Sequence, residues 1–208
     1  MSRICVIGAG CIGLVTASVF AEFGHHVTVL DIDLAKVRSL KRNILPVYEP
    51  ELDDIWMRNR AASRLSVSNK YQEALRDADF AFIAVGTPAA RNGKPNLKWV
   101  RQAARSIAAG AGPSLTVVIK STVPPGTAAV VDGILKKNGR GREFQVVSNP
   151  DFMRKGTAVF DFMHPYKVVV GGASAKAVLE TAALYEPLDS QIVVCDSVTA
   201  EMSKYASN

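Results

Sequence analysis

The chain has 208 residues, of which 48% are hydrophobic, so it can bury one sizeable core or a domain with a small appendage. The first apolar run, residues 4–7, is too short to span a membrane and lacks the features of a signal peptide, which predicts a cytoplasmic protein without a membrane partner. The net charge of +6 comes from scattered Lys and Arg residues rather than a basic stripe with aromatic neighbours, so we expect no nucleic-acid partner.

Short β-branched runs alternate with longer helical stretches along the chain. The expected strands are residues 4–7, 27–30, 80–85, 115–119, 145–147, 168–170 and 192–194. The expected helices are residues 12–23, 34–40, 97–109, 127–137 and 175–185, and residues 197–208 continue with a helical pattern after a cap at Asp196 or Ser197. This alternation predicts an α/β fold with a mainly parallel sheet covered by helices on both faces.

The cysteines and histidines show no pattern of a metal site. Cys5, Cys11 and Cys195 form no CxxC pair, and we expect them to be reduced structural thiols. The three histidines have no ligand spacing with one another or with the cysteines, so no metal is expected.

A glycine-rich segment follows the first expected strand and opens the first expected helix: Gly8-Ala9-Gly10-Cys11-Ile12-Gly13, a GxGxxG pattern. In this context the pattern predicts a dinucleotide-binding turn and a Rossmann-type, doubly wound sheet. Gly8 permits the tight turn, Gly10 lets the backbone approach a pyrophosphate, and Gly13 lets helix and strand pack closely. The helix N-terminus offers free N–H groups to the phosphates.

The second expected strand ends at an acidic residue, Asp31, with Lys36 nearby. A carboxylate at this position accepts hydrogen bonds from the adenosine ribose and would repel a 2′-phosphate, so the sequence predicts NAD rather than NADP as cofactor. The alternative interpretation is an acidic helix start at Asp31 and Asp33.

Five further segments resemble the motifs of one family, the UDP-glucose/GDP-mannose dehydrogenases, in that family's order. Residues 48–52 (YEPEL) resemble YEPGL, residues 82–88 match FIAVGTP, and residues 121–127 (STVPPGT) resemble STVPVGT. Residues 149–156 (NPDFMRKG) resemble NPEFLREG, and residues 201–208 (EMSKYASN) resemble EMxKYAxN. Together with the glycine-rich turn, these motifs cover essentially the whole chain.

The resemblance implies a function and a set of site residues. The family oxidises the C6 alcohol of a nucleotide sugar to an acid with two NAD, and its second oxidation passes through a thioester on a cysteine. By position, Asp151 becomes the general acid/base, Lys204 and Asn208 polarise the substrate oxygen, and Thr122 helps to hold the catalytic water. The other implied contacts are Phe152 and Met153 for the substrate, and the glycine-rich turn, Asp31, Lys36, Val85, Gly86, Thr87, Ser121, Thr122 and Lys155 for NAD.

The positions of several of these residues fit the roles that the resemblance implies. Thr87 and Thr122 follow expected strands, where open α/β sheets bind ligands, and Asp151 follows Asn-Pro just after another strand. Lys204 and Asn208 are four residues apart, so they share one helix face and can hold an oxyanion or a sugar hydroxyl.

The chain departs from the family pattern at several positions. Asp151 stands where the family has Glu, and Lys155 replaces a Glu beside the nicotinamide, so a cation faces the cationic ring. If residues 151–155 are helical, Lys155 also pairs with Asp151. Cys11 replaces Tyr and Glu51 replaces Gly. Cys195 precedes the 201–208 motif and is not the thioester cysteine, so we expect this chain alone to be inactive.

The sequence therefore predicts an NAD-binding domain over residues 1–196 and the start of a connecting helix over residues 197–208, with the middle and C-terminal domains of the family absent from this chain. The expected partners are NAD(H) and a nucleotide sugar, with UDP-glucose favoured by the proline after STV and by the YEP segment, and a homodimer is expected for a full-length protein. Two alternatives stay open: a non-catalytic NAD(H)-binding module, and a GDP-mannose or UDP-amino-sugar dehydrogenase of the same family.

Overall fold

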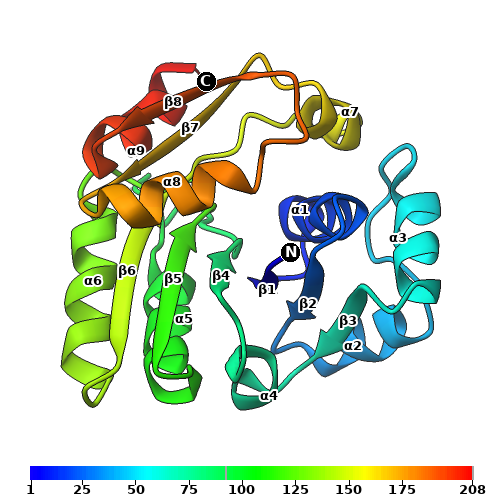
Figure 1. The fold of residues 1–208 in the computed structure, drawn as a ribbon, viewed down its shortest axis with the longest axis horizontal. Coiled ribbons are helices and arrows are strands. Elements are labelled where there is room, and N and C mark those ends of the chain that lie inside the picture. The colour runs from blue at the N-terminus through cyan, green and yellow to red at the C-terminus, as the bar shows by residue number, and fades with distance from the viewer. Residues whose placement is uncertain (92, 208) are drawn as a thin grey trace.

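The computed structural model describes residues 1–91 and 93–207, and within them the strands form a single eight-stranded sheet (Figure 1). The strand order is β3-β2-β1-β4-β5-β6-β7-β8. The strand bounds are β1 Arg3–Ile7, β2 His26–Leu30, β3 Leu65–Ser68, β4 Phe80–Ile83, β5 Ser114–Ile119, β6 Glu143–Ser148, β7 Lys167–Gly172 and β8 Gln191–Cys195.

The first six strands pair in parallel, β7 runs antiparallel to β6, and β8 is parallel to β7. The chain builds β2 and β3 on one side of β1 and then returns to place β4 on its other side. This reversal makes the carboxyl ends of β1 and β4 the switch point where doubly wound sheets bind ligands. The predicted α/β fold with a mainly parallel sheet is confirmed.

Helices cover both faces of the sheet, which explains why β1, β4 and β5 are almost wholly buried. One apolar cluster joins the sheet to α1, α3, α7 and α8, and a second joins it to α4, α5 and α6. The helix bounds are α1 Cys11–Glu22, α2 Leu34–Lys41, α3 Leu52–Ala61, α4 Tyr71–Leu75, α5 Lys98–Gly110, α6 Thr127–Asn138, α7 Ala158–Met163, α8 Ala175–Ala183 and α9 Ser197–Ser207.

The structure contains four elements that the sequence analysis did not predict: β3, α3, α4 and α7. Strand β3 (LSVS) carries two serines and lies at the sheet edge, so its pattern is weak. Helices α4 and α7 have five and six residues, too few to show a helical period. Helix α3 does carry a signal, because its buried Leu52, Ile55 and Trp56 follow an i, i+3, i+4 pattern.

The expected helix near the end of the chain is present as α9, after Asp196, whose carboxylate accepts the N–H of Thr199 at 2.9 Å. Asn208, the last residue of the predicted span, lies outside the described residues. No helix within residues 1–91 and 93–207 combines the length and apolar character that a bilayer crossing needs. The same residues hold no group of three or more His, Cys, Asp and Glu side chains that could bind a metal ion.

Candidate functional site

The glycine-rich turn joins β1 to α1 at the carboxyl edge of the sheet. Gly8 has φ +110°, and a Cβ there would lie 2.6 Å from the carbonyl oxygen of Ala84. A Cβ at Gly13 would lie 1.8 Å from the carbonyl oxygen of Gly8, so both positions exclude larger residues. A Cβ at Gly10 would meet no atom of the described residues within 4 Å. The backbone at Gly10 can therefore be approached closely by a ligand.

A pocket of about 420 Å³ opens beside this turn and is lined by Gly8, Gly10, Asp31, Lys36, Val85 and Gly86, among others. The Asp31 side chain lines this pocket and is held by two backbone N–H groups. One carboxylate oxygen accepts the N–H of Ala9 at 2.7 Å, and the other accepts the N–H of Asp33 at 2.9 Å. Lys36 Nζ lies 3.9 Å from the first oxygen. Asp31 and two of the predicted glycines, Gly8 and Gly10, thus line one cavity, whereas Gly13 packs against the backbone of Gly8.

Hydroxyl groups tie together the two segments that follow β4 and β5. Ser121 Oγ donates to the carbonyl oxygens of Ile83 and Val85, at 3.1 and 2.6 Å. Thr87 Oγ1 donates to the carbonyl oxygen of Thr122 at 2.7 Å. Ser121 and Thr122 line a small cleft next to the pocket, which they share with a lysine of α9, Lys204.

Asp151 and Lys204 form an ion pair at 3.9 Å, with side chains only 7% and 12% exposed. Asp151 follows β6, whereas Lys204 comes from α9, so the fold joins two distant segments here. Lys204 Nζ also lies 5.6 Å from the ring centroid of Phe152, and Lys167 Nζ lies 5.5 Å from the same centroid. Asp151 and Phe152, together with Met153, line a second pocket of about 440 Å³.

Glu201 fixes α9, and sequence reasoning assigned it no role. Its carboxylate accepts the N–H groups of Gly126 and Ala128 at 2.6 and 2.7 Å, and the hydroxyl of Ser148 at 3.2 Å. Burial raises the pKa of Glu201, while these N–H groups oppose the rise. Glu201 thereby holds Lys204 over the site. The sequence signal for Glu201 is its place as the first residue of the 201–208 motif.

Lys120 is a second residue that sequence reasoning missed. Its buried ammonium donates to Asn149 Oδ1 at 3.1 Å and to the Tyr185 hydroxyl at 3.2 Å, and lies over the rings of Phe162 and Tyr185. Burial lowers the pKa of Lys120 to about 8. Lys120 lines the pocket that contains Asp151, and its signal in the sequence is a lysine that ends an apolar strand.

The possible pairing of Lys155 with Asp151 is wrong. Residues 151–154 form no helix and Lys155 lies exposed in a turn, so the i, i+4 geometry does not arise. Asp151 pairs with Lys204 instead. The charge of Lys155 still acts on the glycine-rich turn: burial raises the pKa of Cys11 to about 12, Glu49 and Asp151 add to the rise, and Lys155 opposes it.

Comparison with known proteins agrees with this geometry. The sequence profile of the UDP-glucose/GDP-mannose dehydrogenase family, NAD binding domain, matches residues 2–189. A UDP-glucose 6-dehydrogenase of Bacillus subtilis is 41% identical over 209 residues, covering 100% of this chain and 45% of that protein. The UDP-glucose dehydrogenase structure from Pyrobaculum islandicum has a TM-score of 0.96 at 37% identity, covering 100% of this chain and 49% of that one.

A ternary complex of GDP-mannose dehydrogenase from Pseudomonas aeruginosa has a TM-score of 0.95 at 31% identity, covering 98% of this chain and 48% of that one. The chain thus spans about half the length of the relatives it matches. It belongs to the UDP-glucose/GDP-mannose dehydrogenase family and corresponds to that family's NAD binding domain.

Proposed function

We propose that this chain is the NAD-binding half of a nucleotide-sugar 6-dehydrogenase that oxidises the C6 alcohol of UDP-glucose to the acid with two NAD. The largely buried ion pair of Asp151 and Lys204, whose lysine shares a cleft with Ser121 and Thr122, is the observation that carries the proposal. The names of the relatives from Bacillus subtilis and Pyrobaculum islandicum support UDP-glucose as the substrate.

The pair suits the first oxidation. The Asp151 carboxylate can accept the hydroxyl proton of the alcohol as the alcohol becomes an aldehyde, and bound NAD⁺ would supply the hydride acceptor. The Lys204 ammonium stabilises the negative charge that develops on the oxygen, with Asn208 proposed to assist. Thr122 shares a cleft with Lys204, which supports a role in holding a water molecule.

Asp31 selects NAD over NADP, residues 1–196 form the cofactor domain, and residues 197–208 begin a connecting helix. The full-length protein is a cytoplasmic homodimer.

The test uses the full-length protein that carries this chain, supplied with NAD⁺ and one of UDP-glucose, GDP-mannose or UDP-N-acetylmannosamine. Two NADH per UDP-glucose are expected. Asp151→Asn should lower kcat at least about 100-fold, the usual contribution of a general base. Asp132→Asn, on the outer face of α6, is the matched control and should leave kcat unchanged. Faster turnover of another sugar would overturn the substrate, and NAD binding without turnover of any sugar would favour a non-catalytic module.

A further inference from the structure

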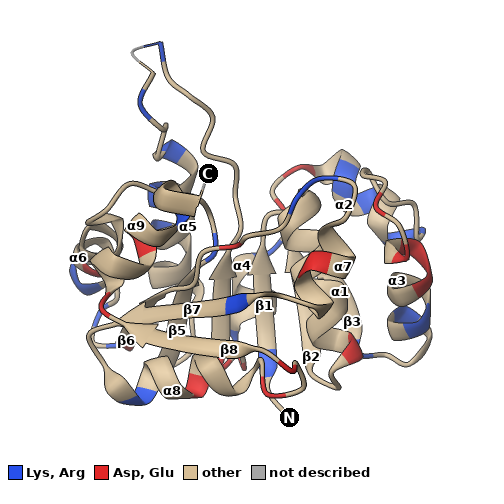
Figure 2. Cartoon of the chain, turned by 90° about the horizontal axis from the view of Figure 1, so that it is seen from above, with Lys and Arg blue, Asp and Glu red and all other residues tan. Residues whose placement is uncertain are grey.

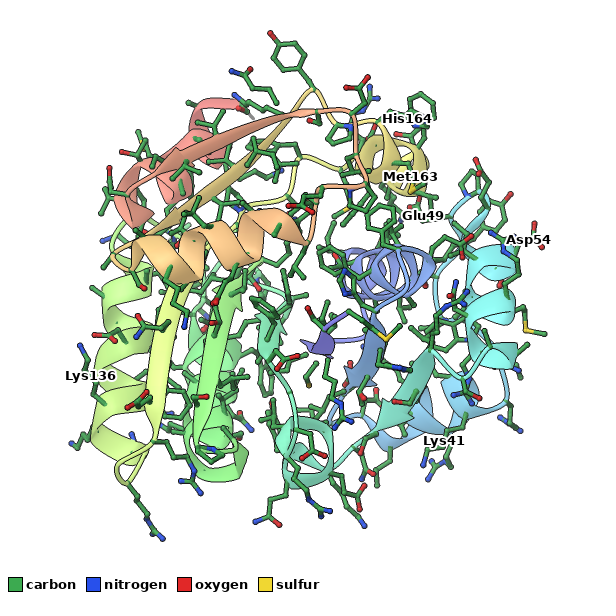
Figure 3. All side chains as sticks on the ribbon, in the orientation of Figure 1. Lys41, Glu49, Asp54, Lys136, Met163 and His164 are labelled. Carbon is green, nitrogen blue, oxygen red and sulfur yellow. The ribbon has the colours of Figure 1, made fainter. Side chains whose placement is uncertain are left out.

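Glu49 bridges two parts of the site that lie far apart in the sequence. Figure 3 shows it between α1 and α7, and its side chain is buried, with 1% of the residue exposed. Its carboxylate accepts the thiol of Cys11 at 3.3 Å, the N–H of Gly156 at 2.9 Å and the N–H of Ala158 at 3.1 Å. One carboxylate thus contacts both the glycine-rich turn and the segment that follows Asp151.

These contacts persist at neutral pH because the carboxylate stays ionised. Burial alone would raise the pKa of Glu49, but the N–H groups of Gly156 and Ala158, together with the Cys11 thiol, hold it below its ordinary value. A buried carboxylate is costly unless hydrogen bonds satisfy it, and here donors from two segments do so. Moving either segment away therefore leaves a buried charge with too few partners.

The two segments have different tasks. Cys11 is the first residue of α1, next to the open backbone of Gly10, and the N–H groups of this helix end are the expected partners of the NAD pyrophosphate. Residues 151–157 form the loop that begins with Asp151. A separate set of hydrogen bonds, from Arg154 to the Asp161 carboxylate, holds the middle of this loop to α7. These bonds do not involve the glycine-rich turn.

We propose that Glu49 is a positioning residue that couples occupation of the glycine-rich turn by NAD to the order of the loop over residues 151–157. NAD bound at the start of α1 restrains Cys11, and the restrained thiol holds the Glu49 carboxylate against Gly156 and Ala158. Coupling of this kind is reciprocal, so an ordered loop also strengthens NAD binding. The inference depends on NAD binding alone and not on the identity of the sugar.

The test measures amide hydrogen exchange by NMR with and without NAD⁺, at the same saturation in each variant as set by calorimetry. In the wild-type chain, NAD⁺ should slow exchange at Gly156 and Ala158 by at least about fivefold, the lower end of typical coupling. Glu49→Gln and Cys11→Ala should reduce this slowing to less than about twofold, whereas Cys11→Ser keeps a donor and should retain it.

The matched control is Glu22→Gln. Glu22 lies at the opposite end of α1 and accepts from Arg58 at 2.9 Å and from Asn59 at 2.6 Å, so it also links elements but not at the turn. It should leave the slowing unchanged. If Glu49→Gln fails to fold, Cys11→Ala still decides, because it leaves the bonds between Glu49 and the loop intact. The proposal would be overturned if NAD⁺ slowed exchange in Cys11→Ala as much as in the wild type. It would also be overturned if NAD⁺ did not slow exchange in the wild type, or if the wild type did not bind NAD⁺.

Discussion

At residue 51 the backbone adopts φ 66° and ψ −14°, the left-handed conformation that favours glycine. Glu51 precedes α3 and makes no side-chain capping bond within the part of the chain that the structure describes. The matching position of the YEPGL motif is a glycine, so this chain bears a backbone cost that the motif avoids. Asp53 and Asp54 already supply negative charge to the first turn of α3.

Glu51→Gly should therefore stabilise the chain by about 0.5–1 kcal/mol, because removing the Cβ relieves the left-handed strain by more than the added chain entropy costs. For a chain of this size the melting temperature should rise by about 1–4 °C in a calorimetric scan. Glu51→Ala is the control, since it removes the charge but keeps the Cβ. A gain of the same size in Glu51→Ala would show that charge, not backbone conformation, sets the effect.

We expect Lys155 to act on the cofactor site through its charge. If the loop lies by the nicotinamide, as the resemblance implies, the ammonium repels the cationic ring of NAD⁺ but not the neutral ring of NADH. At about 6 Å and an effective dielectric near 20 the repulsion is about 3 kcal/mol, which solvent reduces to about 1 kcal/mol for an exposed side chain.

Lys155→Glu removes this repulsion and adds an attraction of similar size, so it should tighten NAD⁺ relative to NADH by up to about 30-fold. Calorimetric dissociation constants for both forms give the ratio, and Lys176→Glu, on α8, is the control with the same charge change at a distance. An unchanged ratio would place the Lys155 ammonium in solvent, away from the ring.

Helix α9 is held in place by close packing against β7 and by the hydrogen bonds of one buried carboxylate. It packs against β7 at Gly171, where a Cβ would lie 2.4 Å from the carbonyl oxygen of Asp196. Its acidic anchor, Glu201, accepts the N–H groups at the start of α6. The position of Lys204 therefore depends on a carboxylate one helical turn before it.

Glu201→Ala should destabilise the chain by about 2–4 kcal/mol, because two buried N–H groups lose their partner. Urea unfolding measures the loss, and faster amide exchange in α9 should accompany it. Glu180→Ala, which removes an exposed carboxylate of α8, should cost less than about 0.5 kcal/mol. Equal unfolding free energies for the two variants would contradict an anchoring role for Glu201.

Features that depend on neighbouring residues could be predicted from the sequence, whereas contacts between distant residues could not. The glycine-rich turn and Asp31 lie within one strand-helix-strand unit, so their pattern is local and could be predicted. Helix α3 was missed although its apolar spacing is present, whereas α4 and α7 are too short to show a period. Glu49 and Glu201 bind partners 38 to 109 residues away in the sequence. No local pattern encodes such contacts, because they exist only once the sheet has brought the segments together.

On the scale of the whole molecule, charge is distributed rather than gathered. Figure 2 shows Lys and Arg on α2, α3 and α6, and α3 also carries acidic residues in its first turn. The net charge of +6 gives a mild attraction for phosphates, and the pocket beside the turn supplies the specific contacts. Because the turn, the end of β2 and the segment after β4 all line this pocket, we expect a dinucleotide bound there to stabilise the centre of the sheet.

NAD⁺ at about 100 times its dissociation constant should therefore stabilise the chain by about 2.7 kcal/mol and raise its melting temperature by about 5–10 °C. NADP⁺ at the same concentration should give at most about half this rise, because its 2′-phosphate meets the Asp31 carboxylate and binding weakens at least about tenfold. Asp31→Asn removes that repulsion and leaves Lys36 free to pair with the phosphate, so the two rises should converge. Asp33→Asn changes the same charge two residues away, keeps a capping side chain on α2, and should preserve the difference. Equal rises for both dinucleotides in the unaltered chain would mean that Asp31 does not face the ribose.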